Sequence, residues 1–445
     1  MLPTKYNEYF NRYYGQQWID AQLPTEPQIW LTGPYELSIK NDTEMITNIA
    51  CEMTAHLDND SWIWPEKTIY FFSDLHADTD AFIASLVASG GFKKTGAKDK
   101  HFKLTPEGKK ARFILGGDCF DKGPSTLRLL RMIKLLIDKG ADVVILAGNH
   151  DTRTLVGILS LSIKREVSTE HLFVRMGLKP LPLFKEIYKH YIKGKKKKNS
   201  KKYIKKLFPS KDWAIQFPQI VQQQLSPAAI KKDIKRTTEK IKSYNGWCAD
   251  EGLSLAQVCL AVKKWQKLFL HPKGEFYWFF KHLKLTEKEG SFFFVHAGVD
   301  DSSAKMIRKH GTKWLNKQFR KKLKNDLFDL YYGPLGNMVR TKYRHYERHF
   351  SKKGTLIMHN SGINVIVHGH RNLYHGQRMM LRKGMINFEC DTSLDINTRK
   401  KEGIVQGNGA SVTIIHPHKL ILGISSDYPF IKVFEPELSL NLCRS

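Results

Sequence analysis

The sequence lacks three features that would place it in a membrane or among secreted proteins. No apolar stretch is long enough to span a bilayer. The six cysteines are scattered, with no Cys-x-x-Cys pair, which argues against a disulfide scaffold or a zinc ribbon. The opening residues Met1–Glu8 lack the apolar core of a signal peptide. We therefore expect a cytoplasmic protein, with export as an effector without a cleavable signal as the alternative.

Positive charge is in excess, and most of the excess lies in residues 152–290. The 445 residues carry a net charge of +29, with 41% hydrophobic and 26% charged residues, as in a globular protein with one large domain and an elaboration. Residues 152–290 hold 30 Lys+Arg against 11 Asp+Glu. Their lysine-rich tract Lys193–Lys206 is either a solvated loop or a surface for an anionic membrane or nucleic acid.

Five short apolar runs each lead into polar residues that could bind a metal. Runs rich in Val, Ile and Phe with glycine at their ends are typical of buried strands. Side chains that follow neighbouring strands meet at one edge of a sheet, so we expect a single cleft. The runs and the residues that follow them are Thr68–Phe72 with Asp74 and His76, Phe113–Leu115 with Asp118 and Asp121, Val143–Ala147 with Asn149 and His150, Phe292–Val295 with His296, and Val365–Val367 with His370.

These residue types favour divalent metals, and their number indicates two ions. Asp, His and Asn are hard or borderline donors. Asp74 and His76 are two apart, so on an extended segment both would face one ion. Asp118 could bridge the two ions, and the second would be held by Asn149, His296 and His370. A hydroxide bridging such a pair is ionised near neutral pH and can attack phosphorus.

Four residues near these ligands are candidates for handling the substrate. We predict that His150 is the general acid, and that Asp121 orients its ring and raises its pKa. Lys122, Arg340 and the ligand Asn149 are the candidates for contacting the substrate phosphate.

The chain divides into a core, an insert and two ends. Residues 67–151 and 291–426 carry the ligands and form the predicted core. Residues 152–290 are predicted to be a basic, mostly helical insert or cap, because the gap exceeds what a connection needs. Residues 1–66 are a leader that packs on the core, with a helix over 41–56, and residues 427–445 are a tail. Within these parts we predict helices over 79–89 (capped by Asp78), 125–139 and 253–270, and a closing hairpin of 411–415 with 420–425.

The motifs resemble those of the calcineurin-like metallophosphoesterases, closest to the phosphoprotein phosphatase branch with bacterial-type features. The segments that carry the resemblance are Asp74-Leu75-His76, Gly117-Asp118-Cys119-Phe120-Asp121-Lys122-Gly123, Gly148-Asn149-His150-Asp151, His296-Ala297-Gly298 and Gly369-His370. The resemblance implies an α/β (α+β) fold, a two-sheet β-sandwich flanked by helices, with two ions such as Mn, Fe or Zn. It also implies that Asp118 bridges the ions, that His150 is the acid paired with Asp121, and that Arg340 binds phosphate.

The sequence departs from that family at four positions. Ser73 and Ala77 replace two glycines, Lys122 replaces an arginine, and Asp151 replaces a glutamate. These changes spare the ligands but leave the substrate class open. The leading prediction is a metal-dependent phosphatase of phosphoserine or phosphothreonine proteins, with phosphotyrosine as a further substrate. The alternatives are a hydrolase of dinucleoside polyphosphates or similar small phosphoanhydrides, and an RNA- or lipid-binding protein with a vestigial phosphatase core.

Overall fold

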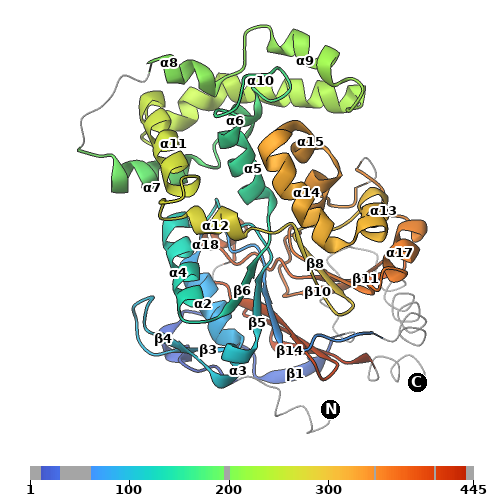
Figure 1. Cartoon of the computed structure of the whole chain (residues 1–445). Coiled ribbons are helices and arrows are strands. Elements are labelled where there is room, and N and C mark those ends of the chain that lie inside the picture. Colours follow the sequence, from blue (N-terminus) through green and yellow to red (C-terminus); the bar gives the residue numbers. More distant parts are fainter. Residues whose placement is uncertain (1–11, 31–61, 195–200, 345–346, 405–406, 437–445) are drawn as a thin grey trace.

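Two mixed β-sheets form the centre of the structure, with helices on their outer faces (Figure 1). The computed structural model describes residues 12–30, 62–194, 201–344, 347–404 and 407–436. The strand order in the larger sheet is β1-β14-β13-β12-β2-β5-β6, and in the smaller one it is β10-β11-β9-β8-β7. The ligand-bearing strands are parallel neighbours, β2 with β5 and β5 with β6 in one sheet, and β8 with β9 in the other.

The strands are short, and several of the central ones are buried along their whole length. Those of the larger sheet are β1 (Glu26–Ile29), β2 (Ile69–Phe72), β5 (Arg112–Leu115), β6 (Asp142–Ile145), β12 (Ser411–His416), β13 (Leu420–Ser425) and β14 (Phe430–Phe434). Those of the smaller sheet are β7 (Thr286–Glu289), β8 (Phe292–Val295), β9 (Val365–His368), β10 (Arg378–Arg382) and β11 (Met385–Glu389). A separate hairpin pairs β3 (Phe92–Lys94) with β4 (Phe102–Leu104).

The alternation of side chains along these strands makes a sandwich. Ile69 and Phe71 of β2 pack in one apolar cluster with Phe292 and Phe294 of β8, and this cluster fills the space between the sheets. Tyr70 of β2 and the remaining alternate residues point the other way, into the larger core beneath the helices. Because both faces are covered, the runs are almost continuously apolar, which made them visible in the sequence.

The helices form flanking layers and a distinct insert. The core helices are α2 (Thr79–Ala88), α3 (Pro106–Lys110), α4 (Thr126–Asp138), α5 (Asn149–Leu159), α13 (Asp301–His310), α14 (Thr312–Asn325), α15 (Leu327–Tyr332), α16 (Pro334–Met338), α17 (Lys352–His359) and α18 (Ile396–Lys401). The insert helices are α6 (Leu172–Arg175), α7 (Leu181–Tyr191), α8 (Lys201–Ile204), α9 (Trp213–Val221), α10 (Pro227–Asp250), α11 (Leu255–Phe269) and α12 (Tyr277–His282). In Figure 1 most of the insert lies at one end of the sandwich, where α5 leads into it.

The clearest sequence predictions of local structure are confirmed. The helices expected over 79–89, 125–139 and 253–270 are α2, α4 and α11, and the closing hairpin is β12 with β13. Asp78 caps α2, since its Oδ1 accepts hydrogen bonds from the backbone N–H groups of Asp80 and Ala81. The mixed fold with a helical insertion agrees with the expected metallophosphoesterase class.

Several elements differ from the sequence reading, and each is polar, short or at an edge. The leader contributes β1, which pairs in parallel with β14, so a strand also lies within the predicted tail 427–445. Strand β1 contains Pro27, which is tolerated because the strand is at the edge of its sheet. Strand β7 reads Thr-Glu-Lys-Glu, typical of a charged edge, and places residues 286–289 in the core sheet instead of the insert. The hairpin β3–β4 and the block α13–α17 were also not anticipated.

Some predictions lie outside the described residues or are only partly covered. The helix expected over 41–56 lies outside them, as does the centre of the Lys193–Lys206 tract, residues 195–200.

Cys119, Cys248, Cys259 and Cys390 are buried free thiols. Within the described part of the chain, no helix is both long and apolar enough to pass through a membrane.

Candidate metal and phosphate site

The predicted ligands come together in one cavity at the ends of the central strands. The cavity has a volume of about 340 Å³. Of the predicted site residues, those that line it are Asp74, His76, Asp118, Lys122, Asn149, His150 and His370. His296 is fully buried behind them, with its Nε2 3.5 Å from Asp118 Oδ1. Asp121 is also buried and reaches the site through His150.

The ligand loops turn sharply as soon as the strands end. Seven non-glycine residues here have left-handed backbone angles: Asp74, His76, Ala77, Asp118, Asp121, Lys122 and His370. The sequence analysis assumed that the segment from Asp74 to His76 is extended. The structure shows a turn instead, and the side chains converge through this turn. Ala77, at a position where the resembled family has glycine, has φ 56°. Such strain concentrates at functional sites and persists because the surroundings hold it.

Glycines allow the loops to approach the two carboxylates closely. A Cβ atom on Gly148 would lie 2.1 Å from Asp118 Oδ1. A Cβ on Gly369 would lie 2.0 Å from Asp74 Oδ2. The same Asp74 oxygen accepts hydrogen bonds from the Ser73 hydroxyl at 2.5 Å and the His370 backbone N–H at 2.9 Å. Ser73, one of the departures from the family pattern, thus takes part in orienting a ligand.

Asp151 holds two of the loops together. Its carboxylate accepts hydrogen bonds from the backbone N–H groups of Asp118 at 2.8 Å, Cys119 at 2.9 Å, Phe120 at 3.1 Å and Gly148 at 3.0 Å. Burial and the nearby charge of Asp118 raise the pKa of Asp151 to about 7, although these N–H groups favour its charged form. The side chain thus fixes the left-handed turn at Asp118 from behind.

Among the described residues, two groups of side chains that could hold a metal ion share Asp118. His76, Asp118 and His150 can bring ligand atoms within 4.8 Å of one another, and so can Asp118, His296 and His370. Asp74 Oδ1 lies 3.8 Å from His76 Nε2 and so adds a carboxylate on the His76 side. Two clusters with one common carboxylate suit a pair of ions bridged by Asp118.

The histidine rings at the cavity have the tautomer that a metal ligand needs. His76 Nδ1 and His296 Nδ1 donate to the carbonyl oxygens of Phe120 and Gly116, and His370 Nε2 donates to that of Arg340. This fixes which nitrogen of each ring is a lone-pair donor toward the cavity. Burial lowers the pKa of His76 and of His370 well below its ordinary value, which keeps both rings neutral, as metal ligands must be.

Asn149 gives an independent indication that a cation fits here. Its Oδ1 faces His296 Nε2 at 3.1 Å. Turned around, the amide would donate to Asp118 Oδ2 at 3.3 Å and to His370 Nδ1 at 2.7 Å, so the oxygen now faces only other acceptors. Acceptors that converge in this way repel one another unless a cation lies between them. The donor set therefore fits divalent metal ions, although it does not select Mn, Fe or Zn.

The His150–Asp121 pair is present, but its protonation differs from the sequence prediction. His150 Nδ1 lies 2.9 Å from Asp121 Oδ2, which orients the ring as expected. The predicted rise in the pKa of His150 is not found. Burial, together with Arg153 and Lys179, holds that pKa well below its ordinary value, while burial raises the pKa of Asp121 to about 6. Desolvation of the charged form outweighs the attraction of Asp121.

Three cationic side chains line the metal cavity, and two of them were missed in the sequence. Lys122 Nζ lies 2.7 Å from His76 Nε2, so a positive group faces this ligand. Lys179, from the insert between α6 and α7, lies 3.3 Å from His150 Nε2, and Lys342 also lines the cavity. Burial lowers the pKa of Lys179 to about 8. Lys179 belongs to no motif, and only the folding of the insert over the core places it here.

Arg340 lies elsewhere than the sequence reading expected. Its backbone carbonyl accepts from His370 Nε2, but its side chain lines the neighbouring cavity, where its guanidinium lies over the ring of Tyr331 at 5.0 Å. His368, beside the ligand His370, faces away from the metal cavity, with its Nε2 3.9 Å from Glu389 Oε1.

Comparison with known proteins agrees with this site. Residues 67–228 match the family model of the calcineurin-like phosphoesterases. No curated protein matches the sequence. Similar solved structures include a cold-active protein tyrosine phosphatase, with 15% identity, a TM-score of 0.41 and coverage of 84% of this chain and 80% of that one. Another, a protein serine/threonine phosphatase from Saccharomyces cerevisiae, has 13% identity, a TM-score of 0.34 and coverage of 88% and 89%.

Proposed function

We propose that this chain, whose residues 67–228 match the calcineurin-like phosphoesterases, is a metal-dependent hydrolase of phosphoric esters that dephosphorylates phosphoserine and phosphothreonine in proteins, with phosphotyrosine as a further substrate. The observation that carries the proposal is the pair of candidate ligand groups that share Asp118; His150 belongs to the first of these groups and also pairs with Asp121. These side chains come from motifs far apart in the sequence, and their convergence in one cavity speaks against the vestigial alternative.

In this proposal the two ions are divalent, with Mn, Fe and Zn as the candidates. Asp74, His76 and Asp118 would hold one ion, and Asp118, Asn149, His296 and His370 would hold the other. Two such ions supply Lewis acidity, which lowers the pKa of water and offsets the charge that develops on the phosphoryl oxygens. Every other part of the reaction falls to the side chains around them.

Lys122, Lys179 and Lys342 bind the phosphoryl oxygens, since all three line the metal cavity. His150 delivers the proton to the leaving oxygen from Nε2, and Asp121 positions the ring through Nδ1. Burial, with the charges of Arg153 and Lys179, lowers the pKa of His150, and a dianionic phosphoryl group that offsets those charges favours a proton on the ring. Substrate binding and acid catalysis are thereby coupled.

Two further observations support a protein substrate in a reducing compartment. The excess of lysine and arginine in residues 152–290 draws acidic, phosphorylated partners toward the cavity. The described cysteines are buried free thiols, which suits a cytoplasmic setting. A dinucleoside polyphosphate or similar phosphoanhydride is the second candidate, because a cationic cavity beside the metal site could hold its phosphate chain.

A substrate panel tests the proposal. The protein with Mn²⁺ is assayed on 4-nitrophenyl phosphate, on peptides with phosphoserine, phosphothreonine or phosphotyrosine, and on a dinucleoside tetraphosphate. We expect turnover of the phosphoserine and phosphothreonine peptides. Turnover of the dinucleoside tetraphosphate alone would refute the protein-phosphatase proposal.

A single variant tests the acid role. His150→Ala should lower kcat on phosphoserine peptides by about 100-fold or more. The loss should be smaller on 4-nitrophenyl phosphate, whose leaving group needs no proton. His190→Ala, an exposed histidine on α7, is the matched control and should leave kcat unchanged. Equal losses on both substrates would contradict the acid role.

A further inference from the structure

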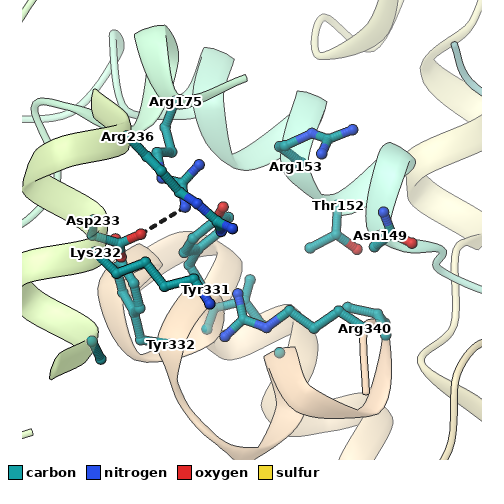
Figure 2. Close-up of a pocket in the computed structure, with 14 residues that line it drawn as sticks. Asn149, Thr152, Arg153, Arg175, Lys232, Asp233, Arg236, Tyr331, Tyr332 and Arg340 are labelled. Atoms are coloured by element: carbon teal, nitrogen blue, oxygen red, sulfur yellow. Dashed lines mark hydrogen bonds and ion pairs between the residues drawn. The ribbon is translucent and has the colours of Figure 1, made fainter. Parts of the chain in front are cut away.

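A second cavity adjoins the metal site and is lined by different elements. It has a volume of about 380 Å³ and lies between α5, the insert helix α10 and the α15–α16 region (Figure 2). Asn149 lines both cavities, so the two adjoin at a predicted metal ligand. Arg153 connects them as well, because its Nη2 lies 3.2 Å from His150 Nδ1 while its side chain lines the second cavity.

The charge of this second cavity is strongly positive. Its cationic lining residues are Arg153, Arg175, Lys232, Arg236 and Arg340. Among the described residues, the one carboxylate that lines it, Asp233, is already paired, since its Oδ1 accepts from Arg175 Nη2 at 2.6 Å. Although burial alone would raise the pKa of Asp233, Arg175 and Tyr332 lower it, so this carboxylate is ionised and offsets a single charge.

Two arginines of the cavity are available for an anion. Among the described residues, neither Arg236 nor Arg340 has a carboxylate within ion-pair distance, and Arg340 is held only by its contact with the Tyr331 ring. Figure 2 shows both side chains extending into the cavity from opposite walls, Arg236 from α10 and Arg340 from the segment after α16. A planar guanidinium matches two phosphate oxygens at once, so two such groups suit a phosphate better than a single carboxylate.

The electrostatic surroundings of this cavity also favour a bound anion. Burial, with the charges of Arg175 and Arg153, lowers the pKa of the nearby Lys240 to about 7. The Nε atoms of Arg153 and Arg175 are buried and have no hydrogen-bond partner in the described structure. Cations held this close without an equal number of carboxylates repel one another, and a bound dianion would relieve that repulsion.

We propose that this basic pocket binds a second phosphate group of the substrate while the first lies at the metals. The proposal rests on the proposed phosphatase function and narrows its substrate to molecules with two phosphate groups, one hydrolysed and one used for recognition. Arg236 and Arg340 grip the second phosphate, so the role of Arg340 is recognition at a distance from the scissile bond.

Binding of linked bisphosphonates tests the proposal without turnover. Alkane bisphosphonates with spacers of increasing length compete with a fluorescent phosphonate on the Mn²⁺-loaded protein, beside a monophosphonate of equal chain length. We expect the best spacer to bind about tenfold or more tighter than the monophosphonate. Arg236→Ala and Arg340→Ala should each reduce that preference toward unity, whereas Lys235→Ala, which removes a charge from α10 outside the pocket, should retain it.

Two sources of a second phosphate are separated by kinetics. Doubly phosphorylated peptides and sugar bisphosphates are each compared with their singly phosphorylated counterparts by kcat/KM. The second phosphate comes from the class of substrate for which the ratio of kcat/KM between the doubly and the singly phosphorylated form depends on Arg236. An equal preference in Arg236→Ala and Lys235→Ala would overturn the subsite, even if the enzyme is active. Absence of turnover on every ester would instead refute the proposed function, while the bisphosphonate binding would still report on the pocket.

Discussion

Asp151→Asn should test how far the metal site depends on the hydrogen bonds that hold its loops, because the change leaves every predicted metal ligand in place. The Asp151 carboxylate accepts four backbone N–H groups from the loops that carry Asp118 and Asn149, and the side chain is fully buried. Asparagine has nearly the same shape but replaces one accepting oxygen with a donating NH₂ group. Two of the four N–H groups would then face a donor inside the protein.

The magnitude follows from these two lost hydrogen bonds. A hydrogen bond to a charged group contributes about 1.5 kcal/mol or more, and an unsatisfied buried donor costs about 1–3 kcal/mol. We expect the free energy of unfolding to fall by about 3 kcal/mol. The backbone at Asp118, with φ 53°, should also relax, so Mn²⁺ affinity should fall although no ligand was changed.

Urea unfolding followed by tryptophan fluorescence measures the first effect, and competition with a fluorescent chelator measures the second. Asp138→Asn is the matched control, because Asp138 is exposed at the end of α4 and this change should alter stability by less than about 0.5 kcal/mol. If Asp151→Asn and Asp138→Asn have the same unfolding midpoint and the same Mn²⁺ affinity, the argument that Asp151 holds the loops is wrong.

Three further predictions concern the metals, a lysine that lines the metal cavity and a buried histidine of the insert. Chelation should abolish turnover, and Mn²⁺ at 100 times its Kd should restore it and stabilise the fold by about 2.7 kcal/mol, seen as a rise in unfolding midpoint. Lys179→Met should lower kcat/KM about tenfold or more, unlike Lys185→Met. Burial lowers the pKa of His171 to about 3, so the unfolded chain takes up this proton first as pH falls below about 6.5. Relative to His171→Phe, the wild type should therefore lose about 1.5 kcal/mol of stability between pH 6.5 and 5, measured by urea unfolding at each pH; a constant difference would refute this.

Local sequence was enough to find the parts that repeat a simple physical pattern. The apolar runs before Asp74 and His296 are strands covered on both faces, and such strands need little context to be recognised. Asp78 was identified as a helix cap from its position alone, and the structure places it there. The edge strands β1 and β7 were missed because they are polar, and their pairing depends on a neighbour far away in the sequence.

By itself, the sequence determined which residues lie at the strand ends and that their donors suit divalent metals. Only the tertiary structure decided the rest: that Lys179 of the insert reaches His150, that Arg340 turns into the neighbouring pocket, and that burial makes His150 a weak base. The physical reason is the separation along the chain of the residues that set each feature. Strand and cap patterns are set by residues a few positions apart, whereas the direction of a long side chain and the pKa of a buried ring depend on what packs against them from distant parts of the chain.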